Sequence, residues 1–310
     1  MGSEEIRSMV DRIGGNSDRI TQSFYDSLAI EMRVINSCIA STRMTFLGEE
    51  FDTPLMLGVI GYFPSMGEDA VEQAALAAKE LNTVLWLSNY ETDEQVRSAA
   101  ATGAKVIRCI KPFRDYGRWI DMLKGTEELG CFAAATDVDH CFNSRGTWDD
   151  YTGSSPRTTE QLAEAAEMLK IPFIVKGCLS VHDAVEAKKA GAKGCILSHH
   201  HNIMNWAVPP AMIAPDVKKA VGEDFAVLVD SGIRTGAEAF KALALGADGL
   251  CVARPFMVPL TEGRKDGVVE FFTKMNGELR SYLNRTGSKD IRSIDPGVLH
   301  RIGWFPDRAF

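Results

Sequence analysis

Residues 195–204, with the sequence CILSHHHNIM, place three consecutive histidines directly after an apolar run. A histidine can accept a proton near neutral pH, and two histidines spaced H-x-H can hold a metal ion. On an extended strand end, His199 and His201 would point one way and His200 the other. The tract therefore allows either a proton-transferring His200 or a metal-binding pair formed by His199 and His201.

The small number of other histidines favours proton transfer. A catalytic zinc ion usually has three protein ligands, and the remaining histidines are His140, His182 and His300. His182 falls in an expected outer helix and His300 in the C-terminal tail. Only His140, with the nearby acids Asp137 and Asp139, could complete a metal site.

Other polar residues also follow apolar runs of strand length. In an α/β barrel, the side chains at the ends of the strands gather on one face, and that face carries the active site. A single residue at such a position can equally cap a helix or lie in solvent. The evidence for a site therefore comes from the whole set of polar residues at the strand ends. Its members are Ser88, Asp137, Asp139, Lys176, Ser198, Asp230, Arg234 and Arg254.

The stretches VLVDSGIRTG and VARPF resemble a phosphate-binding site. Small residues let backbone N–H groups approach phosphate oxygens, and arginine balances the negative charge. Gly232, Arg234 and Arg254 provide these features at the ends of the seventh and eighth apolar runs, which is the usual phosphate site of a (β/α)8 barrel. The alternative is a tight turn with surface arginines.

The elements that would position these residues alternate between strands and helices. Continuous apolar runs are typical of a parallel sheet that is covered on both faces. Eight such runs, each followed by an amphipathic stretch, predict an α/β protein with a (β/α)8 TIM barrel; a doubly wound open sheet is the alternative. The runs are PLMLGVIG, TVLWLS, AKVIRCI, CFAAATDV, PFIVKG, GCILSH, FAVLVDSG and GLCVAR.

The length of 310 residues fits a single barrel domain. Residues 1–53 are expected to form a helical N-terminal extension, residues 54–287 the barrel and residues 288–310 a short tail. The longest interruption, HCFNSRGTWDDYTGSSPR, follows the fourth run. A loop of this length at that face is expected to shape the active site.

Composition excludes several classes of partner. The net charge is −8 and the basic residues are scattered, so neither nucleic acid nor a membrane surface is an expected partner. The seven cysteines include no C-x-x-C pair, and the N-terminus has no signal-peptide pattern. These features predict a cytoplasmic protein with a small-molecule substrate.

Two stretches resemble the FMN-dependent α-hydroxy-acid oxidases and dehydrogenases, a family that includes glycolate oxidase, lactate oxidase and mandelate dehydrogenase. They are IVKGCLSVHDAVEAKKAGAKGCILSHHH and LVDSGIRTGAEAFKALALGADGLCVARPF. The resemblance implies a TIM barrel that binds FMN, transfers a hydride from a small hydroxylated substrate to the flavin, and forms a homo-oligomer, a tetramer in this family.

The resemblance also implies roles for individual residues. His200 matches the catalytic base, Asp230 the carboxylate that holds this base, and Lys176 the lysine that stabilises reduced flavin. His201 and Arg145 are expected to contact the substrate. The implied cofactor-binding residues are Val59, Ile60, Gly61, Ser88, Arg108, Lys176, Ser198, Asp230, Ser231, Gly232, Arg234, Ala253 and Arg254.

The substrate half of the site departs from the family pattern. Ile203 stands where the family has an arginine that binds the substrate carboxylate, and Ile110, next to Lys111, stands where a tyrosine is expected. A carboxylate could then be held only by Arg108 or Arg145, so short 2-hydroxy acids are expected to be poor substrates.

The sequence thus predicts an FMN-dependent oxidoreductase that oxidises a 2-hydroxy acid or a derivative of one, with a histidine base. An FMN-dependent isomerase or reductase on the same barrel is one alternative. A metal-dependent hydrolase that uses His199 and His201, and an FMN-binding protein without catalytic activity, are the others.

Overall fold

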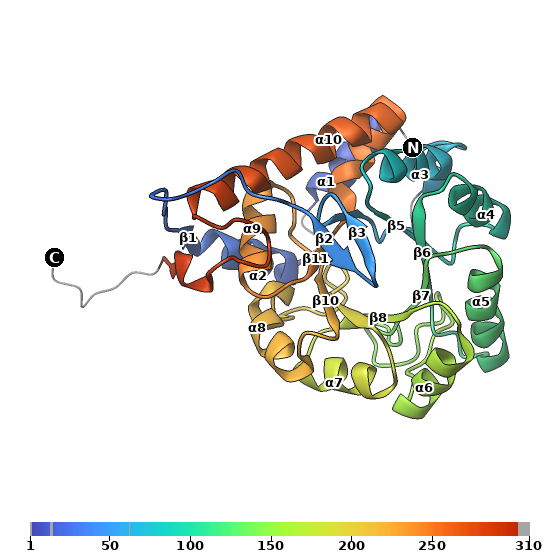
Figure 1. Cartoon of the computed structure of the whole chain (residues 1–310). Coiled ribbons are helices and arrows are strands. Elements are labelled where there is room, and N and C mark those ends of the chain that lie inside the picture. Colours follow the sequence, from blue (N-terminus) through green and yellow to red (C-terminus); the bar gives the residue numbers. More distant parts are fainter. Residues whose placement is uncertain (1, 13–14, 62, 303–310) are drawn as a thin grey trace.

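The computed structural model describes residues 2–12, 15–61 and 63–302, and Figure 1 shows their arrangement. Eight parallel strands close into a barrel in the order β10-β11-β4-β5-β6-β7-β8-β9. Each of the eight expected apolar runs forms one of these strands, so the prediction of a TIM barrel is confirmed. The strands are β4 Leu55–Leu57, β5 Val84–Ser88, β6 Lys105–Ile110, β7 Ala133–Asp137, β8 Phe173–Cys178, β9 Gly194–Leu197, β10 Ala226–Val229 and β11 Gly249–Val252.

Helices surround the barrel because the apolar face of each amphipathic stretch packs on the strands. Several begin with a side-chain cap; Thr92, Thr158 and Thr235 each form a capping box with the Gln or Glu three residues later. The helices are α3 Ala70–Glu80, α4 Asp93–Ala101, α5 Tyr116–Glu128, α6 Thr159–Met168, α7 Val181–Lys189, α8 Pro210–Val221, α9 Gly236–Ala244 and α10 Met257–Arg285.

The last helix, α10, spans 29 residues. It begins at Met257 with Pro259 in its first turn, where the missing N–H of proline is tolerated. The chain bends at Arg264, which has a φ of 52°. Short 3-10 helices, η1 Phe63–Met66 and η2 Arg254–Phe256, follow β4 and β11.

The N-terminal segment contains the expected helices, α1 Ser3–Asp11 and α2 Asn16–Asp26, and also strands that were not expected. β1 Leu28–Ile30 pairs with β12 Leu299–Arg301, which follows η3 Pro296–Val298. The hairpin of β2 Met44–Phe46 and β3 Glu49–Phe51 packs on Phe132, which precedes β7, and so covers the N-terminal end of the barrel.

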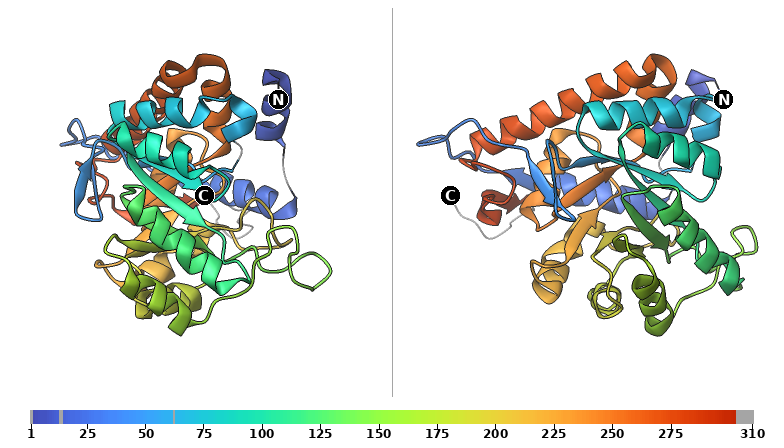
Figure 2. Two further views of the ribbon diagram at one scale, coloured as in Figure 1. Left: turned by 90° about the vertical axis from the view of Figure 1, so that its right-hand side faces the viewer. Right: turned by 45° about the vertical axis from the view of Figure 1, so that its right-hand side comes forward.

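The opposite, C-terminal end of the barrel carries the long loops. The loop between β7 and α6 extends away from the barrel, as the left view of Figure 2 shows. Helix α2 lies beside the loop after β9, where the Ser17 N–H donates to Asn202 Oδ1 and the Ser17 hydroxyl donates to the carbonyl of Met204. Of the predicted tail, residues 303–310 lie outside the described part of the chain. No described helix has the length and hydropathy needed to cross a membrane.

Candidate functional site

A cavity of about 600 Å³ opens at the C-terminal end of the barrel. Its walls come from the ends of β4, β8, β10 and β11 and from the loop after β9, so residues far apart in the sequence meet there. This volume is in the range of small-molecule sites. The predicted site residues on its walls are Val59, Ile60, Gly61, Lys176, His200, His201, Asp230, Ser231, Gly232, Arg234, Ala253 and Arg254.

One end of this cavity has the features of an anion site. Gly232 has a φ of 80°, in the left-handed region that glycine adopts readily. The backbone N–H groups of Gly232, Ile233 and Arg234 donate to no other group in the described part of the chain. The Arg234 side chain is exposed on the same wall. Such donors beside a cation suit a phosphate group.

The second arginine, Arg254, is already engaged by the protein. Its guanidinium donates to His201 Nε2 at 3.0 Å and to the carbonyl of Arg12 at 3.1 Å, and it lies 3.6 Å from the Asp18 carboxylate. His201 Nδ1 also faces Asp18, at 2.5 Å. Arg254 therefore connects the cavity wall to helix α2 as well as adding positive charge near the anion site.

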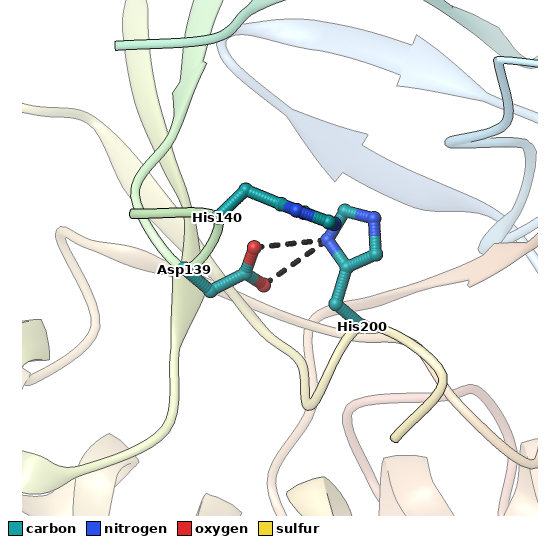
Figure 3. Close-up of side chains that lie close together, drawn as sticks. All are labelled: Asp139, His140 and His200. Atoms are coloured by element: carbon teal, nitrogen blue, oxygen red, sulfur yellow. Dashed lines mark hydrogen bonds and ion pairs between the residues drawn. The ribbon is translucent and has the colours of Figure 1, made fainter. Parts of the chain in front are cut away.

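His200 projects into the other part of the cavity among charged groups, and Figure 3 shows it with Asp139 and His140. His200 Nδ1 lies 2.9 Å from Asp139 Oδ1, 3.5 Å from Asp137 Oδ2 and 3.0 Å from Lys176 Nζ. Lys176 Nζ in turn lies 3.4 Å from Asp137 Oδ2 and 3.8 Å from Asp139 Oδ2. Two carboxylates, a lysine and a histidine thus form one network.

The protonation of this network follows from what each group can donate. An ammonium group only donates and an ionised carboxylate only accepts, so Nδ1 of His200 cannot bond to both Lys176 and Asp139. Lys176 can donate to both carboxylates instead. We therefore assign the imidazole proton to Nδ1, donated to Asp139, which leaves the lone pair on Nε2 free to accept a proton.

The pKa values of the network agree with this assignment. Burial lowers the pKa of His200, but the Asp139 and Asp137 carboxylates outweigh burial and the net pKa is raised. Burial also opposes the charge on Lys176, yet the same two carboxylates raise its pKa. Burial raises the pKa of Asp137, whereas Lys111 and Lys176 lower it well below the ordinary value. Lys176 and Asp137 therefore form an ion pair inside the barrel.

The carboxylate that holds His200 is Asp139, and the prediction that Asp230 has this role is wrong. Asp230 lines the cavity, but its Oδ1 accepts a hydrogen bond from the Ser231 hydroxyl. The sequence placed Asp137 and Asp139 at a strand end and offered them, with His140, as metal ligands, but it did not pair either acid with His200. Their pairing with His200 joins the end of β7 to the loop after β9, a contact that no local pattern encodes.

Arg108, predicted to contact the cofactor, lies away from the cavity. It is buried between β6 and α4, where it donates to Asp93 Oδ1 at 2.8 Å and to the carbonyl of Glu91. Successive residues of a strand point to opposite sides, and Cys109 takes the inward position. Lys111, which follows β6, donates to Asp137 Oδ2 at 2.8 Å.

Three further predicted contacts are not seen on the cavity walls. The Ser198 hydroxyl accepts the N–H of His200 at 3.0 Å, so Ser198 supports the histidine loop. The Ser88 hydroxyl donates to Glu91 Oε2 at 2.8 Å. Arg145 is exposed in the loop between β7 and α6. Ile203 does line the cavity, so the wall has an apolar side chain at the position where the family has a substrate-binding arginine.

His199 and His201 do not form the metal pair that an extended strand would allow. Strand β9 ends at Leu197, and His200, His201 and Asn202 have φ values of 47°, 53° and 69°. His199 is buried with its Nε2 2.8 Å from the Thr21 hydroxyl, whereas His201 contacts Asp18 and Arg254. This left-handed turn, which was not predicted from the sequence, places His199 and His201 in different environments.

A different group in the described chain, Asp139, His140 and His200, has its potential ligand atoms within 4.8 Å of one another. Lys176 Nζ, however, lies 3.0 Å from His200 Nδ1 and carries a positive charge. A divalent cation at this point would meet strong repulsion. The charges therefore favour proton transfer by His200 over metal binding.

Comparisons with known proteins agree with the fold. The family model described as FMN-dependent dehydrogenase matches residues 14–159 and 147–301. A 2-hydroxyacid oxidase from Dictyostelium discoideum is 25% identical, covering 92% of this chain and 84% of that protein. A 4-hydroxymandelate oxidase from Amycolatopsis orientalis is 28% identical, covering 81% of this chain and 80% of that protein.

Solved structures of mandelate oxidase variants have a similar fold. A variant of mandelate oxidase with a monooxide FMN adduct has a TM-score of 0.82 and 25% identity, and the similarity covers 96% of each chain. Another mandelate oxidase variant, with (S)-mandelic acid, has a TM-score of 0.83 and 25% identity and covers 97% of this chain and 95% of that chain.

Proposed function

The chain belongs to the FMN-dependent dehydrogenase family, and we propose that His200 and its neighbours perform the chemistry of this oxidoreductase, the oxidation of a hydroxy acid or a derivative of one. FMN is the cofactor. The observation that carries the proposal is the cavity itself. It has an anion site at Gly232 and Arg234, and Lys176 and His200 also line it.

The residues present suit FMN. Gly232, Ile233 and Arg234 would hold the phosphate group, and Lys176 supplies positive charge for the isoalloxazine ring. Ser231 and Asp230 offer further polar groups on the cavity wall, and apolar walls come from Val59, Ile60 and Ala253. When bound, FMN supplies a two-electron acceptor for the hydride that leaves the carbon bearing the hydroxyl group.

The protein supplies the base for this reaction. His200 Nε2 accepts the hydroxyl proton as the C–H bond breaks and the C=O bond forms, and Asp139 stabilises the resulting imidazolium at Nδ1. Lys111 keeps Asp137 ionised without adding net charge, because the two form an ion pair. This arrangement uses a carboxylate-held histidine in the way that hydrolase triads do.

Replacing Arg234 with Ala tests the phosphate site. A charge-assisted hydrogen bond to phosphate is worth about 1.5–3 kcal/mol, so we expect FMN affinity to fall about 10- to 100-fold. The measurement is the dissociation constant of FMN from the apoprotein by fluorescence titration. Arg285→Ala, at the end of α10 and remote from the cavity, is the control. An unchanged affinity in the Arg234 variant would place the phosphate elsewhere.

The pH dependence tests the base. Because the pKa of His200 is raised, the rate of flavin reduction should fall as the pH drops through a value above the ordinary pKa of 6.5. Asp139→Asn removes the carboxylate that raises this pKa most, so the acidic limb of the rate profile should move to lower pH, with a lower maximal rate. Anaerobic stopped-flow reduction across the pH range measures both. An acidic limb that stays in place would mean that Asp139 does not hold the base.

We also propose that the protein is a cytoplasmic homo-oligomer, a tetramer by resemblance to the family. An exposed apolar segment after β1 supports self-association, since exposed apolar patches often mark interfaces. Its large side chains are Met32, Val34, Ile35 and Ile39. All seven cysteines are free thiols, in keeping with a reducing compartment. Light scattering after gel filtration is expected to give about four times the chain mass, and a monomer mass would refute this proposal.

A further inference from the structure

His140, which no part of the proposed reaction uses, lines the cavity next to the proposed base. It follows Asp139 in the loop after β7, and its ring lies 4.1 Å from the His200 ring at an angle of 83°. Figure 3 shows the two rings edge to face above the Asp139 carboxylate. A group bound at His200 therefore lies within reach of His140.

The neighbours of His140 determine which of its nitrogens carries the proton. His140 Nδ1 lies 3.4 Å from Asp149 Oδ2. Because an ionised carboxylate only accepts, Nδ1 carries the proton. Burial and the nearby charges of His200 and Lys111 lower the pKa of His140 to about 4, so the ring is neutral near pH 7. Its Nε2 then has a lone pair, and no described residue donates to it.

The cations near the cavity are balanced by the protein. Lys176 is paired with Asp137 and Asp139, and Arg254 with Asp18. Arg234 lies at the anion site. Among the described residues that line the cavity, no further arginine or lysine lies beside His200. A substrate carboxylate placed there would meet the lone pair of His140 rather than a donor.

We propose that His140 is a specificity-determining residue whose Nε2 accepts a hydrogen bond from an uncharged donor next to the carbon that is oxidised. The preferred substrates are then uncharged derivatives of 2-hydroxy acids with an N–H at this place, and 2-hydroxy amides are the simplest class. This inference rests on the proposed function, since it concerns the substrate of the same site.

The test compares acids with their amides on the FMN-loaded protein. Glycolate and glycolamide, lactate and lactamide, and mandelate and mandelamide differ only in the group that faces His140. Anaerobic stopped-flow spectroscopy gives the second-order rate constant of flavin reduction for each compound. We expect the amide to react about tenfold faster than its acid in at least one pair, because one hydrogen bond replaces a contact between two acceptors.

Two variants test the role of His140 itself. In Asp149→Asn, the carboxamide oxygen can keep the bond from the Tyr151 N–H that Asp149 Oδ1 accepts, while the new NH2 group donates to His140 Nδ1. The proton then moves to Nε2, and the preference should shift toward the acid. In His140→Leu the preference for the amide should disappear. Asp150→Asn, an exposed position in the same loop, is the matched control and should keep the wild-type ratio.

The outcomes separate this inference from the proposed function. Reduction of FMN by acids in preference to amides would overturn the inference and leave the oxidoreductase intact. An amide preference that persists in both His140→Leu and Asp149→Asn would also overturn it. If none of the six compounds reduces bound FMN, the proposed function itself fails, and the inference fails with it.

Discussion

Replacing His200 with Asn is expected to slow the reduction of bound FMN by hydroxylated substrates about 100- to 10,000-fold, which is the usual contribution of a general base. The physical reason is that Asn has no group that can accept a proton near neutral pH. Asn also tolerates the left-handed backbone of this position, where φ is 47°, so the loop should keep its conformation.

The measurement is the limiting rate of anaerobic flavin reduction. FMN content, which depends on the anion site at Gly232 and Arg234, should remain close to that of the wild type. His182→Asn is the matched control, because His182 is 79% exposed on α7 and should leave the rate unchanged. A rate for His200→Asn close to that of the wild type would show that another group takes the proton.

Much of the barrel could be predicted because its signals are local. Eight apolar runs and the caps of the following helices define each β-then-α unit, and a closed barrel places the end of every strand on one face. Lys176 and Arg234 could be placed on that face from their positions alone, Lys176 near the end of β8 and Arg234 after β10.

The pairs that give the site its chemistry could not be predicted in this way. Asp139 and His200 are neighbours where the loop after β9 turns through three residues of positive φ, a backbone that residues other than glycine adopt uncommonly. Arg108 was misplaced for a related reason, since a shift of one residue in a strand reverses the side that a side chain faces. The contact of Asp18 with His201 depends on how α2 packs, which no local pattern reports.

The balance of charge inside the barrel has a consequence for catalysis. Lys111, Lys176, Asp137 and Asp139 contribute two positive and two negative charges, so the network is neutral when His200 is neutral. Transfer of the hydroxyl proton makes His200 positive, and Lys176 would offset the negative charge that FMN, when bound, gains in the reaction. Lys176 is suited to act on both charges, because it contacts both carboxylates and lines the cavity.

Replacing Lys176 with Met is therefore expected to slow flavin reduction about 100- to 1,000-fold, the usual effect of removing one preorganised electrostatic contact. The affinity of oxidised flavin for sulfite should fall as well, because that complex also places negative charge on the ring. The variant should also move the acidic limb of the rate profile to higher pH, because the positive charge of Lys176 lowers the pKa of His200 and its loss lets that pKa rise.

Lys193→Met, at an exposed position just before β9, is the control for loss of a lysine. Stopped-flow reduction at several pH values and a sulfite titration give the three quantities. The two parts of the expectation have different causes: the sulfite affinity reports the charge beside the flavin, and the acidic limb reports the charge beside His200. Loss of sulfite affinity without a shift of the limb would place Lys176 at the flavin alone. A shift of the limb with unchanged sulfite affinity and reduction rate would mean that Lys176 only balances Asp137 and Asp139.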